Sequence, residues 1–173
     1  IILAAGAIGF AFFVWNGQND LESDFNNLES TILVGIWEDL SRNTDYTPYS
    51  TNRFWLFEFG DNQVNNTEYF SVSNSNTRIT IIKSGWYKIH LSALLGDIND
   101  GTAYSMKFYK NGDVYGYSSY LIGGGPFIYM DGTVFIECNA KDYIEISAYS
   151  AADDFIVYTI ANYEHLTIEY VVL

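Results

Sequence analysis

From Phe54 onward, apolar and polar side chains alternate along short runs, and turn residues separate these runs. A period of two is typical of strands that bury one face, because successive side chains point to opposite faces of a sheet. Asn111-Gly112, Asp131-Gly132 and the stretch 123–126 (GGGP) supply the turn chemistry. The expected strands are Phe54–Phe59, Glu68–Val72, Thr77–Ile82, Gly85–Leu95, Ala103–Lys110, Val114–Leu121, Thr133–Cys138, Tyr143–Ser150 and Leu166–Val172. This spacing predicts a mainly β fold, an antiparallel β-sandwich.

Residues 1–41 have a different pattern, which predicts a long N-terminal helix, first hydrophobic and then amphipathic. Ile1–Trp15 is apolar throughout, and no Lys or Arg precedes Arg42. A secretory signal begins with a basic segment, so we expect a processed chain that keeps this apolar segment. At ~1.5 Å per residue such a helix spans roughly 22 Å, less than the ~30 Å of a bilayer core. Its Ala and Gly residues favour close packing against sister helices.

Residues 21–40 continue this prediction with apolar side chains every three or four positions. Such a stripe indicates either a helix that packs on its own β-domain or a short coiled-coil stalk. The expected organisation is a helix over 1–41, a linker over 42–53 and a β-sandwich head over 54–173. The residues predicted to drive self-assembly are Ile1, Ile2, Leu3, Ala5, Gly6, Ile8, Gly9, Phe10, Phe12, Phe13, Val14, Trp15, Leu21, Phe25, Leu28 and Ile32.

The charge balance narrows the classes of partner. The chain carries a net charge of −13 with only 8 cationic side chains, which argues against a nucleic-acid partner. Charged residues make up 17% of the chain, and Asn, Ser, Thr and Tyr supply most of its polarity, as in extracellular proteins. The triplet Asn65-Asn66-Thr67 is an acceptor sequence for N-glycosylation at Asn65. The single Cys138 lies in an expected strand and is predicted to be a buried, inert thiol.

No arrangement of residues typical of an enzyme emerges, so we expect a non-enzymatic protein without a cofactor. His90 and His165 have no metal-ligand spacing and are predicted to be bystanders. Loop oxygens of Asp97, Asn99 and Asp100 could gather a Ca²⁺ ion, as could the pair 153–154, but solvated loop acids are the preferred interpretation.

Tyrosines on the expected outward strand faces could form a glycan-binding or subunit-contact surface. These tyrosines are Tyr104, Tyr109, Tyr115, Tyr117 and Tyr120.

Several stretches, taken in order, resemble the C1q/TNF-type jelly roll over residues ~54–173. The run 80–89 (TIIKSGWYKI) is similar to that family's opening strand, glycine and x-Tyr-x-apolar strand. The strand 106–112 ends in Asn111-Gly112, and 139–146 (NAKDYIEI) resembles the family's Gly-Asp-x-apolar step with Lys141 in place of glycine. Residues 166–170 resemble the last inner strand. The resemblance implies a head that trimerises and binds a ligand or receptor.

The layout of the whole chain is similar to archaeal type IV pilins and archaellins, in which apolar helices form a filament core under β-heads. Our leading hypothesis from sequence is therefore an extracellular, pilin-like surface filament subunit that passes through the membrane before it assembles with copies of itself. Adhesion is a further candidate role of this filament. The alternative is a membrane- or virion-anchored trimer with a C1q/TNF-like head. Surface glycans or a receptor are the expected further partners.

Overall fold

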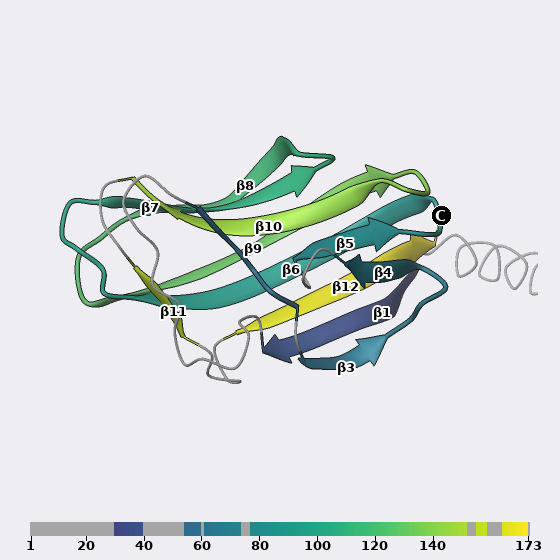
Figure 1. Cartoon of the computed structure of the whole chain (residues 1–173), viewed down its shortest axis with the longest axis horizontal. Coiled ribbons are helices and arrows are strands. Elements are labelled where there is room, and N and C mark those ends of the chain that lie inside the picture. The colour runs from purple at the N-terminus through teal and green to yellow at the C-terminus, as the bar shows by residue number, and fades with distance from the viewer. Residues whose placement is uncertain are drawn as a thin grey trace, which may run out of the picture. The chain divides into compact units, whose positions relative to one another are not determined.

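The computed structural model describes residues 30–39, 54–59, 61–73, 77–151, 155–158 and 164–172. The chain divides into two compact units, and the unit Thr31–Val171 contains nearly all of the described residues. This unit is a β-sandwich of two layers (Figure 1). None of the described residues belongs to a helix long and apolar enough to cross a membrane.

The first sheet is built around β6 (Gly85–Gly96). One edge of β6 pairs with β9 (Phe127–Cys138), and the other pairs with β12 (His165–Val172) and β11 (Ile156–Tyr158), all antiparallel. The sheet continues from β12 to β1 (Ser30–Asp39) and then to β3 (Asp61–Asn65). β9 therefore lies at one margin of this sheet and β3 at the other.

The second sheet is built around β10 (Tyr143–Ser150). One edge of β10 pairs with β7 (Ala103–Lys110), which pairs with β8 (Asp113–Ile122). The other edge pairs with β5 (Arg78–Ile81) and β2 (Phe54–Leu56), and β5 pairs with β4 (Phe70–Ser73). Each predicted strand is present, so the prediction of an antiparallel β-sandwich is confirmed. β1, β3, β11 and the first half of β9 were not predicted.

The predicted helix is wrong for residues 30–39, which form strand β1 between β12 and β3. Val34 and Trp37 of this strand are fully buried, so pairing and burial outweigh the helix-like spacing of its apolar residues. Ile32 is not a coiled-coil position, because it lies in this strand with 43% of its surface exposed. The β-fold thus begins at Ser30 rather than at Phe54. The other predicted assembly residues, from Ile1 to Leu28, and the linker over 42–53 lie outside the described residues.

The core between the sheets is rich in aromatic rings. Trp37 of β1 contacts Phe59 and Phe70, with ring centroids 5.7 and 5.4 Å apart. Ile89 and Leu91 on the inner face of β6 are fully buried in the same core. Each such side chain contributes roughly 1.5–3 kcal/mol on burial, so the core does not need a disulfide.

A tyrosine cluster closes one end of the sandwich and explains one glycine. Tyr87 donates a hydrogen bond to the Lys83 carbonyl over 2.5 Å, and its ring meets that of Tyr170 at 5.3 Å. The Tyr170 ring lies against Gly85, where an added Cβ would be 2.6 Å from a ring carbon. Gly85 also has a φ of +151°, which side chains disfavour. Two separate features, the Tyr170 ring and the positive φ, therefore favour glycine at this position, where the C1q/TNF-type pattern also has a glycine.

Two turns carry further positive φ angles. Asn111 (φ 54°) and Gly112 (φ 86°) join β7 to β8, in agreement with the predicted Asn-Gly turn. Lys141, which stands where the resemblance has glycine, adopts a φ of 80°. A left-handed conformation costs a residue with a Cβ about 1–2 kcal/mol. The departure from the family pattern therefore places backbone strain in the loop before β10.

We expect Gly85→Ala to lower the free energy of unfolding by about 1–3 kcal/mol, because the new methyl group meets Tyr170 at an unfavourable φ. Gly124→Ala is the matched control, since nothing lies within 4 Å of its added Cβ. Urea denaturation followed by tyrosine and tryptophan fluorescence measures both. Equal stability of the two variants would contradict the role given to Gly85.

We expect Lys141→Gly to raise the free energy of unfolding by roughly 0.5–1 kcal/mol, the relief of strain less the added entropy of the unfolded chain. Lys141→Ala removes the same charge but keeps a Cβ at φ 80°, so it should not stabilise. If both variants gained stability equally, the cause would be the charge and not the backbone.

Candidate interaction face

The outward side of the first sheet is a regular array of side chains, because β9, β6 and β12 are in unbroken register. Alternate residues of β9 point away from the core, and those at odd positions from Phe127 to Glu137 are all exposed. Across the strands these side chains form rows, such as Asp131–Ser92–His165 and Thr133–His90–Thr167. We call the outward residues of these three strands and of β11 the interaction face.

One end of the interaction face is apolar. Phe127 and Tyr129 of β9 are exposed, and Leu94 of β6 lies between Tyr129 and Tyr158 of β11 in register. The rings of Phe127 and Tyr158 meet at 5.6 Å. Gly96 makes this contact feasible, because an added Cβ would collide with the Tyr158 ring. The aromatic side chains therefore form a preformed surface patch.

The middle of the interaction face carries two histidines side by side. The rings of His90 (β6) and His165 (β12) are 5.4 Å apart at 46°. His90 Nδ1 is 3.0 Å from Thr133 Oγ1, and His165 Nδ1 is 2.7 Å from Oγ of the fully buried Ser92. Burial lowers the pKa of His165, and the neighbouring His90 lowers it further. This pair was not predicted, because 75 residues separate the two positions.

Next to the histidines, around Lys88 of β6, the interaction face carries both charged and aromatic side chains. Lys88 Nζ forms an ion pair with Glu169 Oε1 at 3.0 Å. A hydrogen bond from Thr31 lowers the pKa of Glu169, and the bond from Lys88 lowers it further. Phe135 stands beside Lys88 in register and keeps 56% of its surface exposed. An aromatic ring left in water beside a satisfied ion pair is typical of a contact surface.

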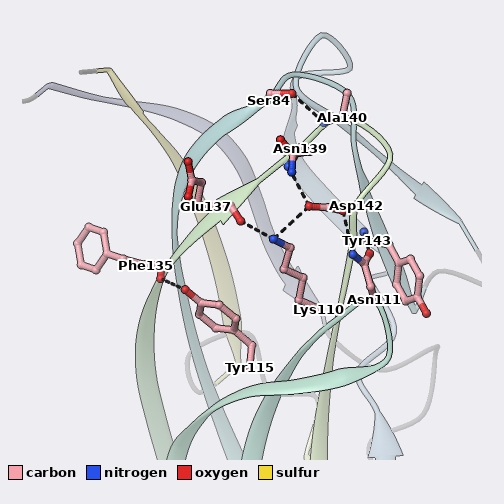
Figure 2. Close-up of polar contacts among 10 residues, drawn as sticks. All are labelled: Ser84, Lys110, Asn111, Tyr115, Phe135, Glu137, Asn139, Ala140, Asp142 and Tyr143. Carbon is pink, nitrogen blue, oxygen red and sulfur yellow. Dashed lines mark hydrogen bonds and ion pairs between the residues drawn. The ribbon is translucent and has the colours of Figure 1, made fainter.

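Side chains of strand β8 in the second sheet form hydrogen bonds with the edge of β9 that faces away from β6. Tyr115 donates a hydrogen bond to the Phe135 carbonyl over 3.0 Å, while the Phe135 ring points away from the sandwich (Figure 2). Ser119 donates a second bond to the Asp131 carbonyl over 3.3 Å. These bonds join the margins of the two sheets and hold Phe135 in place.

A polar clamp around Asp142 secures the same end of both sheets (Figure 2). Lys110 Nζ donates to the Glu137 carbonyl of β9 over 2.7 Å and pairs with Asp142 at 3.1 Å. Asp142 also accepts hydrogen bonds from Asn111 Nδ2 over 2.8 Å and from the Asn139 amide over 2.9 Å. The bond from Asn111 contributes most to lowering the pKa of Asp142, and those from Asn139 and Lys110 add to it.

Strand β1, which lies beyond β12 in the first sheet, exposes aliphatic rather than aromatic side chains. Ile32 and Leu33 of β1 are 43% and 46% exposed, and as consecutive residues of a strand they point to opposite faces of the sheet. The sheet therefore carries an aromatic margin at β9 and an aliphatic region at β1, with β6 and β12 between them.

The tyrosines predicted to point outward divide into two groups. Tyr115, Tyr117 and Tyr120 are exposed. The prediction for Tyr104 is wrong, because this residue is fully buried and its hydroxyl oxygen accepts a hydrogen bond from the Asn99 amide over 3.0 Å. Tyr109 is half-buried. Tyr117 stacks with Lys107 on the outer side of the second sheet, 5.0 Å from ring centroid to Nζ.

The remaining candidate residues lie apart from the interaction face. Cys138 is buried as predicted, and burial raises the pKa of its thiol to about 11, so it is a poor nucleophile. Asn65 is exposed at the end of β3. Asp97 and Asp100 are exposed in the loop after β6, and 153–154 lie outside the described residues. No cluster of three metal-ligating side chains occurs among the residues that the structure describes.

Comparisons with known proteins identify the fold. No protein-family model and no curated protein matches the chain. The structure of the Eiger TNF from S. frugiperda is similar over 80% of this chain and 92% of that chain, with a TM-score of 0.53 and 9% identity. The crystal structure of murine APRIL at pH 8.5 is similar over 82% of this chain and 99% of that chain, with a TM-score of 0.55 and 8% identity. The fold is therefore a TNF-type jelly roll.

We expect Asp142→Asn to lower the free energy of unfolding by about 1–3 kcal/mol at pH 7, because a neutral amide cannot accept all the bonds of the clamp. The folded-state pKa of Asp142 is lowered, so its stabilisation is present above its ordinary value of 3.8 and is lost as pH falls through the folded value. The difference from the unmodified chain should thus shrink below about pH 4. Urea denaturation between pH 7 and pH 3 tests this, with the exposed Asp113→Asn as control.

Proposed function

We propose that the chain is a non-enzymatic extracellular protein whose jelly-roll head assembles as a homotrimer and binds a receptor or other ligand. The TNF-type fold supports this reading over the pilin-like filament, whose defining residues 1–28 lie outside the described residues. The single observation that carries the proposal is the aromatic margin at β9. Its rings are exposed to water, and the hydrogen bond from Tyr115 of β8 holds the backbone of Phe135 in place.

The distribution of the apolar surface supports a ring of copies. A two-fold dimer uses the same patch on both subunits, whereas a ring brings two different patches together. Here Phe127, Tyr129 and Phe135 lie at one margin of the sheet, and Ile32 and Leu33 lie on β1. Packing the aromatic margin of one copy against β1 of the next would bury the aromatic rings together with the aliphatic side chain of β1 on that face. A ring that closes at three agrees with what the C1q/TNF resemblance implies.

The rest of the chain takes supporting roles in this proposal. Ile1–Trp15 would anchor the head to a membrane or virion, or join the copies below it. The net charge of −13 favours a receptor with a basic surface, because complementary charge speeds encounter. Exposed Asn65 of β3 would carry a glycan.

We expect the full chain, kept in solution by a mild detergent, to sediment at three times its monomer mass of 19.6 kDa. Phe135→Glu should weaken association by tenfold or more, since it places a charge in a desolvated contact, at a cost of about 1–3 kcal/mol or higher. Analytical ultracentrifugation with detergent density matching gives both results.

Tyr117→Ser is the matched control, because it removes an aromatic ring that is 62% exposed but stacks on Lys107 of the second sheet. This variant should remain trimeric. A monomeric unmodified chain would refute the trimer, and filaments seen by electron microscopy would restore the pilin-like hypothesis.

A further inference from the structure

The His90–His165 pair occupies the middle of the interaction face, between the aromatic margin at β9 and the aliphatic β1. These are the 2 histidines of the whole chain, so they contribute all of its imidazole titration. Both rings are half-buried already in a single copy. In the trimer proposed above, a neighbouring copy that packs across the interaction face would cover them further.

We propose that this histidine pair makes the assembly sensitive to pH: the trimer forms while both rings are neutral, and it opens when they are protonated. The inference rests on the trimer proposed above, because only a covered pair is taken out of water on assembly. It adds control of trimer assembly by pH, which the fold alone does not imply.

The surroundings of the pair favour two neutral rings. Thr133 and Ser92 each offer a hydroxyl group, which can donate to or accept from a neutral imidazole nitrogen. Two imidazolium ions with ring centroids 5.4 Å apart would repel each other, and the repulsion grows as water is removed. The neutral pair therefore fits a covered face, and the charged pair does not.

Charged groups on the adjacent strands offset this repulsion only in part. Asp131 of β9 lies 3.8 Å from His90 Nε2, but its side chain is 60% exposed and thus screened by solvent. Glu169 of β12 is engaged by Lys88 of β6 and by Thr31. Asp131, and less strongly Glu38 of β1, raise the pKa of His165, yet burial and His90 outweigh them, so the net pKa of His165 is lowered.

The sign of the effect follows from proton linkage. If covering the pair disfavours the charged rings, the trimer binds fewer protons than three separate copies, and acid favours the separate copies. General electrostatics act in the opposite direction. A chain of net charge −13 loses negative charge as pH falls, which weakens repulsion between copies. Dissociation in mild acid is therefore specific to the histidines.

The test is sedimentation of the full chain in detergent at pH 7.5 and pH 5.5, with a chelator present so that no metal ion bridges the rings. We expect the trimer dissociation constant to rise by about tenfold or more at the lower pH, as one pKa unit of differential protonation gives a factor of ten. Return to pH 7.5 should restore the trimer, and tyrosine fluorescence should show folded heads throughout.

His90→Gln with His165→Gln removes the titration and keeps hydrogen-bonding groups of similar size. This double variant should stay trimeric at both pH values. A second variant, His90→Asn with His165→Asn, serves the same purpose if the longer amides disturb the contact. A trimer of the unmodified chain that is equally tight at both pH values, or acid dissociation that persists in the variants, would overturn the switch and leave the trimer standing. A monomer at both pH values would overturn the trimer itself.

Discussion

The antiparallel pairing of β6 with β9 along one edge and with β12 along the other determines the rest of the first sheet. Because the side-chain period of a strand is two, this double register sends Ile89 and Leu91 into the core and His90 and Ser92 to the opposite side. A slip of one residue would reverse both sets at once. The burial of the core and the layout of the interaction face therefore depend on the same hydrogen bonds.

Most of the fold could be predicted from local patterns, because the strands of a sandwich alternate along their own sequence. The Asn111-Gly112 turn was also readable, since it needs two positive φ angles. β1 was not, because the spacing of Leu28, Ile32 and Ile36 matches a helix and only pairing with β12 makes it a strand. β3 is largely polar and β11 has three residues, so neither carries a clear apolar alternation.

The interaction face could be predicted only in fragments. The alternation of Trp86, Lys88 and His90 correctly indicated one side of a strand, whereas the exposed tyrosines that were expected on β8 lie outside the interaction face. The partner of His90 could not be found, because the register between strands far apart in sequence depends on the whole fold. Gly85 and Lys141 show the opposite case, because both lie in short motifs that could be recognised from sequence and the structure supplies the physical cause. At Gly85 a tyrosine ring packs on the glycine, and at Lys141 the backbone is left-handed.

The hydrogen bonds from Tyr115 and Ser119 to the β9 carbonyls have a consequence for how copies of this chain meet. Of the described strands, β9 pairs only with β6, and an open edge of this kind normally invites another chain to extend the sheet. Side chains of β8 occupy two of its carbonyl acceptors and obstruct that route. Neighbours must then recognise one another through side-chain shape and charge, which guards the assembly against growth by addition of strands to the sheet.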